Sequence, residues 1–497
     1  MKLEFLTEQT TCLGQVLREM KMAEETAEVI LPDSCPDAAQ VLFSSGMAFL
    51  RGKELTEGRL TISAGVSGMA LVQPQEDAAP QVVEAYIPMS IRLENPAIQP
   101  GMEAEVVICL RRLDGHLVNP RKVMLRAAVS AEITLWERRQ EQHITGCAQK
   151  DICMLHKTMP IRCLSAMGEK NYTVEDTVQP TPAGTIRQLA GVQAALRHTD
   201  ARLTGTRAVL KGEAELQLLY QNSDGVFTTG TAILPFSQYI DLGDCGEEDE
   251  LQLTSCLTGA DVEPTIEGSG VNVTLQLLTM AKVWSRRELR YLADAYSLNG
   301  ALTPETEERS YQSLLDRQFF SPIGRGNITG DMQRVIYCTC LLGEGTHSRE
   351  GEAVNFSMPV TACILWEDGQ GQLHGGSTEI RLEAASRASE DCRFRLCAED
   401  LHAAASMGGD GAELRLTGTL EADSFGESHM TELLGADWQE AERSQGGPGL
   451  VIRRIRPGET LWDAAKAAGT TQEAIMEANG LSEDQQPQGM LLIPRGR

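Results

Sequence analysis

The sequence lacks the short motifs that mark the common catalytic machineries. It contains no Gly-x-x-x-x-Gly-Lys-Ser/Thr phosphate loop, no His-Glu-x-x-His zinc motif and no Gly-x-Ser-x-Gly nucleophile turn. Gly324, Gly326 and Gly330 approach a nucleotide-binding fingerprint, but the spacing is wrong and no strand-like segment leads into them. The acidic run 244–250 lacks the alternating ligands of a calcium loop. We therefore expect a protein that is not an enzyme and that holds neither a cofactor nor a metal ion.

Long apolar runs and paired cysteines are missing as well. No stretch of 18 apolar residues occurs, so no transmembrane segment is expected. The N-terminal residues carry charges where a secretory signal needs an apolar core. The 13 cysteines are scattered and form no Cys-x-x-Cys, which is typical of a reduced compartment, and we expect Cys338 and Cys340 to pack in a core. These features predict a protein that stays in the cytosol.

Aromatic residues are sparse, at 5%, and positive charge is in deficit: the 497 residues carry a net charge of −26. From Leu450 onward six basic residues balance six acidic ones, so the whole excess belongs to the preceding body. Such a body repels phosphate backbones, which makes nucleic acid an unfavourable partner and favours a basic or neutral protein surface.

The body repeats itself along the chain. Three strand-like segments, 60–73, 208–221 and 354–367, can be laid over one another, and their last apolar residues are spaced by roughly 147 residues. A second anchor agrees, because the segments ending in Trp136 and Trp284 have the same spacing and a shorter third copy ends in Phe425. Apolar and polar residues alternate within these segments, as in half-buried strands.

We therefore predict a β-rich protein of several domains. Each repeat is expected to form an antiparallel β-sandwich-like domain led by a short helix, with the three helices at 36–42, 183–192 and 330–336. The glycine-rich segment before Leu450 is expected to be a flexible tether. The predicted units are 1–165, 166–310 and 311–435 for the repeats, 436–449 for the linker and 450–497 for a small C-terminal domain.

The C-terminal domain shows a strand, two short helices and a second strand in that order. Thr460 is placed to cap the first helix, with Asp463 three residues later to complete a capping box. Gly469 ends this helix, and Asn479-Gly480 ends the next one. The segment 490–493 is apolar and predicts the final strand.

This pattern resembles a LysM domain. The matching residues are 457–462, 479–481 and 488–489, together with Leu491, Ile493 and Pro494, and Glu459 stands where the family usually has aspartate. The resemblance implies a βααβ fold with a groove between two loops, which takes chains containing N-acetylglucosamine or a protein partner. Residues such as Trp462 can serve the fold alone. The predicted groove residues are Gly458, Glu459, Thr460, Leu461, Asn479, Gly480, Leu481, Gln488 and Gly489.

The order of three repeats and a LysM domain resembles the SPOCS-repeat proteins of spore-forming bacteria. The residues that carry this resemblance are Leu31–Asp37 and Leu292–Ser297, and the third repeat shows no clear counterpart of the latter. The resemblance implies a scaffold in spore coat assembly, acting from the mother-cell cytosol at the forespore surface. Its LysM domain would dock onto a coat-basement morphogenetic ATPase, and its body would meet other coat proteins.

Two other interpretations are open. A cell-wall or cortex protein could bind peptidoglycan through the same groove. The sheets of the three repeats could also have open edges, in which case self-association by strand addition is expected.

Overall fold

Each repeat packs as two antiparallel sheets, and each sheet has three strand positions. The computed structural model describes residues 3–75, 78–149, 151–243, 245–388, 392–440, 449–456, 458–482 and 489–494. In the first repeat the sheets have the orders β1-β6-β5 and β2-β3-β4. Its strands are β1 (Phe5–Ile30), β2 (Ala38–Thr56), β3 (Arg59–Pro74), β4 (Gln81–Glu94), β5 (Glu103–Asn119) and β6 (Lys122–Cys147).

The second repeat has the same topology, with sheets β7-β12-β11 and β8-β9-β10. A single pairing, Leu13 with Leu164, joins its larger sheet to that of the first repeat. Its strands are β7 (Ile152–Val178), β8 (Ile186–Thr204), β9 (Arg207–Asn222), β10 (Phe227–Asp241), β11 (Glu250–Pro264) and β12 (Val271–Ser297).

The third repeat contains every strand position of the other two, although its first two strands are each split. The pairs β13/β14 and β15/β16 take the places of the first and second strands. Its strands are β13 (Gly300–Phe320), β14 (Ile323–Thr329), β15 (Arg334–Leu342), β16 (Thr346–Glu350), β17 (Ala353–Glu367), β18 (Leu373–Arg387), β19 (Arg393–Gly408) and β20 (Gly411–Glu440).

The predicted β-rich fold class and the sequence repeat are confirmed. The three aligned segments are β3, β9 and β17. Each is the central strand of the sheet with the shorter strands, which does not extend into the stalk. Buried and exposed residues alternate along them, as at Val354, Phe356 and Met358 in β17. Their buried sides face the larger sheet and form one apolar core in each repeat.

The predicted leading helices are wrong, because all three segments lie in or beside strands: 36–42 enters β2, 183–192 enters β8 and 330–336 enters β15. Each of these strands carries β-bulges at this point. A bulge places two residues opposite one and interrupts the period of two. Apolar residues then recur three apart, as Ala38 and Val41 do, and imitate helical spacing.

The predicted domain boundaries at 165, 310 and 435 fall inside β7, β13 and β20. The turns between repeats lie instead between Cys147 and Ile152 and between Ser297 and Gly300. These three strands run well past the sandwiches. Residues 436–440 of the predicted linker continue β20, and 441–448 lie outside the described residues.

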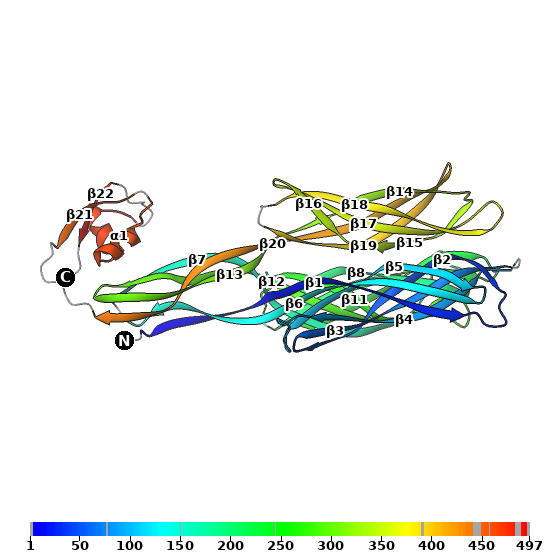
Figure 1. Cartoon of the computed structure of the whole chain (residues 1–497), viewed down its shortest axis with the longest axis horizontal. Helices are drawn as coiled ribbons and strands as arrows, with labels where there is room; N and C mark the ends of the chain where they lie inside the picture. Colours follow the sequence, from blue (N-terminus) through cyan, green and yellow to red (C-terminus); the bar gives the residue numbers. More distant parts are fainter. Residues whose placement is uncertain are drawn as a thin grey trace.

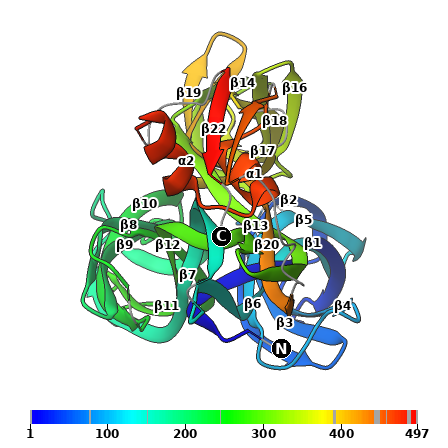
Figure 2. The same ribbon diagram turned by 90° about the vertical axis from the view of Figure 1, so that its left-hand side faces the viewer.

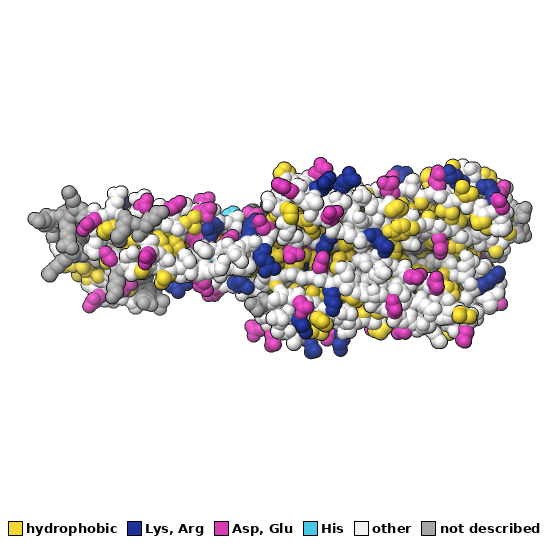
Figure 3. Space-filling view, turned by 90° about the horizontal axis from the view of Figure 1, so that it is seen from below, with side chains coloured by type: hydrophobic (Ala, Val, Ile, Leu, Met, Phe, Trp, Pro, Cys, Tyr) yellow, Lys and Arg dark blue, Asp and Glu magenta, His cyan; other side chains and the backbone are white. Residues whose placement is uncertain are grey.

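The extended halves of the first and last strands form a three-armed stalk. Figure 1 shows the stalk leaving the three sandwiches on one side, and Figure 2 shows the sandwiches as three lobes around a common axis. Where body meets stalk, Trp136, Trp284 and Phe425 converge in one buried cluster. The second sequence anchor therefore marks the axis of the molecule. Figure 3 shows the narrow stalk beside the broad body, with charges of both signs on each.

The same junction holds buried charges that cross between repeats. Glu105 of β5 pairs with Lys282 of β12 at 2.7 Å and with Arg395 of β19 at 3.0 Å. Nearby, Arg317 pairs with Asp423 at 2.6 Å within the third repeat and with Glu250 of the second repeat at 2.5 Å. Because these residues come from three repeats, the ion pairs fix how the repeats meet.

The outer strands of the two sheets meet at the corners of each sandwich. In the first repeat β1 lies beside β4 and β2 lies beside β5, and the other repeats show the same arrangement. Self-association by strand addition stays a prediction. It would have to use the parts of the outer strands that do not lie beside the facing sheet.

Candidate functional site: the C-terminal groove

The C-terminal domain has the predicted βααβ order. It consists of β21 (Leu450–Arg454), α1 (Leu461–Ala468), α2 (Gln472–Asn479) and β22 (Met490–Pro494), and the two strands pair antiparallel. Figure 1 shows it at the far end of the stalk. Its core contains Ala465, Ile475, Leu491 and Ile493, all buried.

The first groove loop is held by the predicted capping box. The Thr460 hydroxyl accepts a hydrogen bond from the Asp463 amide at 3.2 Å, and the Asp463 carboxylate accepts one from the Thr460 amide at 2.9 Å. These bonds satisfy backbone donors that the start of a helix leaves open. Hydrogen bonds from the hydroxyl and amide of Thr460 lower the pKa of Asp463, so this cap persists to acidic pH.

Glu459 fits the turn despite its extra methylene. Its carboxylate folds back and accepts a hydrogen bond from the Arg456 amide at 2.9 Å, and it also pairs with the Arg453 guanidinium. The longer side chain therefore links residues 453, 456 and 459 on the way into α1. Glu459 is half-buried, whereas its neighbours Gly458 and Thr460 are exposed.

Asn479 has a structural role at the second loop. Its side-chain amide donates to the carbonyls of Ile475 and Leu492 and accepts from the Leu492 amide, each at 2.7 Å. The side chain thus fastens the end of α2 to β22. Gly480 then adopts φ 63°, which a glycine tolerates and which turns the chain toward Leu481.

The described residues of the predicted groove include three exposed glycines. Gly458, Gly480 and Gly489 are exposed, and a Cβ at any of them would meet no atom within 4 Å. Leu461 and Leu481 are half-buried beside them and supply an apolar floor. Gln488 lies outside the described residues. Of the other predicted positions, Leu461 begins α1 and Asn479 ends α2, and the rest lie in the adjoining loops. The arrangement suits recognition by backbone polar groups and apolar contact.

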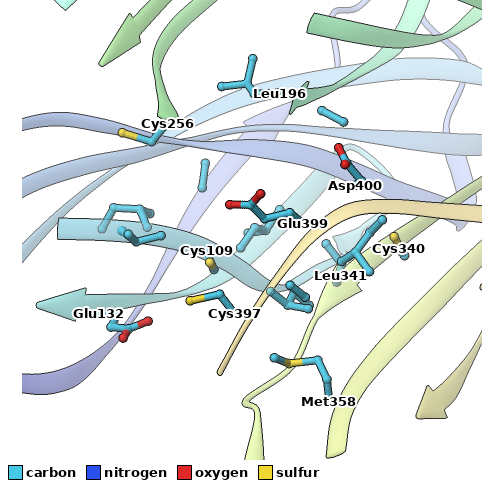
Figure 4. Close-up of a pocket in the computed structure, with 18 of the residues that line it drawn as sticks. Cys109, Glu132, Leu196, Cys256, Cys340, Leu341, Met358, Cys397, Glu399 and Asp400 are labelled. Carbon is cyan, nitrogen blue, oxygen red and sulfur yellow. The ribbon is translucent and has the colours of Figure 1, made fainter. Parts of the chain in front are cut away.

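A second space lies in the body, where residues of all three repeats line a half-open cavity of about 890 Å³. In Figure 4, Glu132, Glu399, Asp400, Cys109 and Cys397 surround this space. Burial and the neighbouring carboxylates of Glu421 and Asp400 raise the pKa of Glu399 to about 7. Among the described residues no three His, Cys, Asp or Glu side chains are arranged to hold a metal ion.

The predicted cysteine packing is confirmed for Cys338, which is buried in the core of the third repeat. Burial raises the pKa of Cys338 to about 12 and that of Cys340 to about 11. Both thiols therefore stay protonated and unreactive at neutral pH.

Replacing Glu399 by glutamine is expected to raise the melting temperature at pH 8 by about 1–3 °C. The folded protein keeps the Glu399 proton up to about pH 7, whereas the unfolded chain loses it near pH 4.5. Stability therefore falls as pH rises through this window, and the glutamine removes that fall. The effect is small because Glu399 is exposed to the cavity. Calorimetry at pH 5 and pH 8 measures the two melting temperatures, with a substitution of the exposed Glu413 by glutamine as control. If the melting temperature changed between pH 5 and pH 8 by the same amount in the wild type and in E399Q, the expectation would be contradicted.

Comparison with known proteins assigns the C-terminal domain. Residues 454–488 match the family model of the LysM domain. The chain carries a LysM domain. This family suggests binding of peptidoglycan or other carbohydrate. No curated protein and no solved structure matches the chain. Within the described residues, no helix of the structure is long and apolar enough to cross a membrane.

The contact between the LysM domain and the stalk was missed by sequence reasoning. The segment Leu292–Ser297 was singled out as a family feature, without a role for any side chain. In the structure Asp294 and Tyr296 of this segment touch Trp462, which was expected only to build the LysM fold. The sequence signal for this contact was the placement of Asp294 and Tyr296, a carboxylate and an aromatic residue two positions apart near the end of β12.

Proposed function

We propose that the protein is a non-enzymatic scaffold in spore coat assembly. It would act from the mother-cell cytosol at the forespore surface, where its LysM domain docks onto a coat-basement morphogenetic ATPase while its body meets other coat proteins. The support is the order of three repeats and a LysM domain, together with a body that holds three sandwiches in one unit.

The observation that favours a protein partner is an apolar strip on the LysM domain. Leu450, Ile452 and Met490 are 52%, 64% and 73% exposed. The pairing of Ile452 with Leu492 and of Arg454 with Met490 places these residues on the outer face of the two strands, away from α1 and α2. Large apolar side chains gathered on a small domain favour contact with another protein surface.

A second candidate function is binding of peptidoglycan through the groove. The family match favours it, as do the exposed glycines and the apolar floor of Leu461 and Leu481. A shallow site of this kind suits a sugar chain with N-acetyl groups. The two candidates use different faces of the same domain, so they can be separated by substitution.

The test uses the full chain and two variants. Ile452→Glu changes the apolar strip, and Leu461→Asp changes the groove; circular dichroism checks that each variant is folded. Affinity capture from sporulating cells is expected to retain an ATPase with the wild type and L461D, and to lose it by at least tenfold with I452E.

The matching assay is a pull-down with purified peptidoglycan, with free chitin fragments as competitor. Saturable retention that L461D abolishes and I452E keeps, with no polypeptide captured from cells, would replace the scaffold by the wall-binding function. Loss of polypeptide capture with I452E, without retention on peptidoglycan, supports the scaffold.

A further inference from the structure

The LysM domain is seated on the stalk by a specific set of polar contacts. The Trp462 indole nitrogen donates a hydrogen bond to the Asp294 carboxylate at 2.7 Å, and the Lys466 ammonium lies 2.7 Å from the same carboxylate. Trp462 and Lys466 are four residues apart on α1, so they share one face of the helix. One carboxylate on β12 therefore receives two donors from one helical face.

Tyr296 completes the seat. Its ring meets the Trp462 ring edge to face, with centroids 4.8 Å apart, and its hydroxyl donates to the Thr470 carbonyl at 2.6 Å. Tyr296, Trp462 and Thr470 are all buried. Leu155 and Leu298 of the stalk pack against the same cluster. The contact thus has an apolar centre and satisfied polar groups, as specific interfaces do.

Asp294 and Tyr296 have no equivalent residues in the first and third repeats. In every repeat a bulge occurs nine residues after the aromatic residue at the axis, at Thr145, Ala293 and Leu434. Counting from these bulges, Gly146 and Gly435 take the place of Asp294 in the other repeats.

The place of Tyr296 is taken by Ala148 and Asp437. A pseudo-threefold stalk could offer three equivalent seats. Only the arm of the second repeat carries both the carboxylate and the aromatic ring. These two residues therefore determine which arm the LysM domain contacts.

We propose that Asp294 and Tyr296 form an intramolecular docking site for the α1 face of the LysM domain, which holds the domain as a fixed head with its groove open. The exposed groove glycines Gly458, Gly480 and Gly489 lie outside the seat, while the face of Trp462 is buried in it. A ligand in the groove would therefore bind a domain that is held in a fixed orientation at the end of the stalk. The docking is independent of whether that ligand is a protein or a glycan.

A zero-length carbodiimide cross-link tests the seat in the full chain. The reagent is expected to join Lys466 to Asp294, and peptide mass spectrometry identifies the product. Tyr296→Ala keeps both reacting groups but removes the aromatic contact, so the yield is expected to fall at least fivefold. Asp437→Ala, at the equivalent place of the third repeat, is expected to leave the yield unchanged. The surface pair of Lys53 and Glu169 serves as an internal reference in all samples.

X-ray scattering gives a second measurement, since release of the head in Y296A is expected to increase the maximum dimension. A mixture of isotopically light and heavy chains separates contacts within one chain from contacts between copies. Absence of the Lys466–Asp294 product, an unchanged yield in Y296A, or a product that joins light to heavy chains would each overturn the proposal. Loss of the Lys53–Glu169 product would reveal a body that fails to fold.

Discussion

Replacing Glu105 by glutamine is expected to destabilise the body by about 3–5 kcal/mol, which is the usual cost of breaking a buried ion pair from one side. Glu105 is 1% exposed and holds Lys282 and Arg395 at 2.7 and 3.0 Å. The amide has the same shape but no charge. Two buried cations from different repeats would then face each other without their shared anion, and the junction of the three repeats would open first.

The same carboxylate should make the protein sensitive to acid. Burial alone would raise the pKa of Glu105, but the Arg395 and Lys282 cations outweigh it and lower the pKa to about 2. A lowered folded-state pKa means that the contribution to stability is complete above about pH 4.5 and is lost as pH falls toward 2. E105Q should therefore differ most from the wild type at neutral pH and converge with it near pH 2.

Urea denaturation followed by tryptophan fluorescence at several pH values measures both effects, since Trp136 donates to the Glu105 carboxylate. Glu103→Gln is the matched control, two residues away on the same strand and only half-buried, and it should change stability by less than about 0.5 kcal/mol. If E105Q and E103Q unfolded at the same urea concentration at pH 7, the ion pairs would not hold the repeats together.

The sequence predicts strands and repeats well where a single local pattern determines them. Alternation in 354–367 and the spacing of Trp136 and Trp284 are enough to find the sandwiches. The bulges in β2, β8 and β15 break that alternation, so the short helices predicted there are wrong. Bulges are fixed by partner strands far away in the chain, and local spacing does not record them.

The LysM domain was predictable because its caps and turns are local signals. Thr460, Asp463 and Gly480 act as their positions in the sequence suggest. The seat on the stalk and the charged junction were not predictable in this way. Asp294 meets Lys466 across 172 residues, and Glu105 meets Lys282 across 177. Such pairs can be predicted only once the arrangement of the three repeats around their common axis is known.

Replacing Trp284 by alanine is expected to remove about 3–5 kcal/mol of stability, the range for truncating a buried aromatic residue. Trp284 lies at the centre of the axial cluster, 6.1 Å from the ring of Trp136 and 5.8 Å from that of Phe425. Its indole nitrogen also donates to Gln252 at 3.3 Å. The loss should therefore reach arms of all three repeats, because each contributes a ring to the cluster.

Hydrogen exchange measured by mass spectrometry is the suitable readout, since a protein of several domains need not unfold in one step. In W284A, exchange is expected to accelerate in the stalk halves of β1, β12 and β20 together. Trp366→Ala removes a ring of similar burial from the core of the third sandwich, and its effect should stay within that repeat. A W284A pattern confined to the second repeat would show that the arms are stable one by one. The stalk would then be three independent pairs of strands, and a head seated on one of them would not be held by the other two.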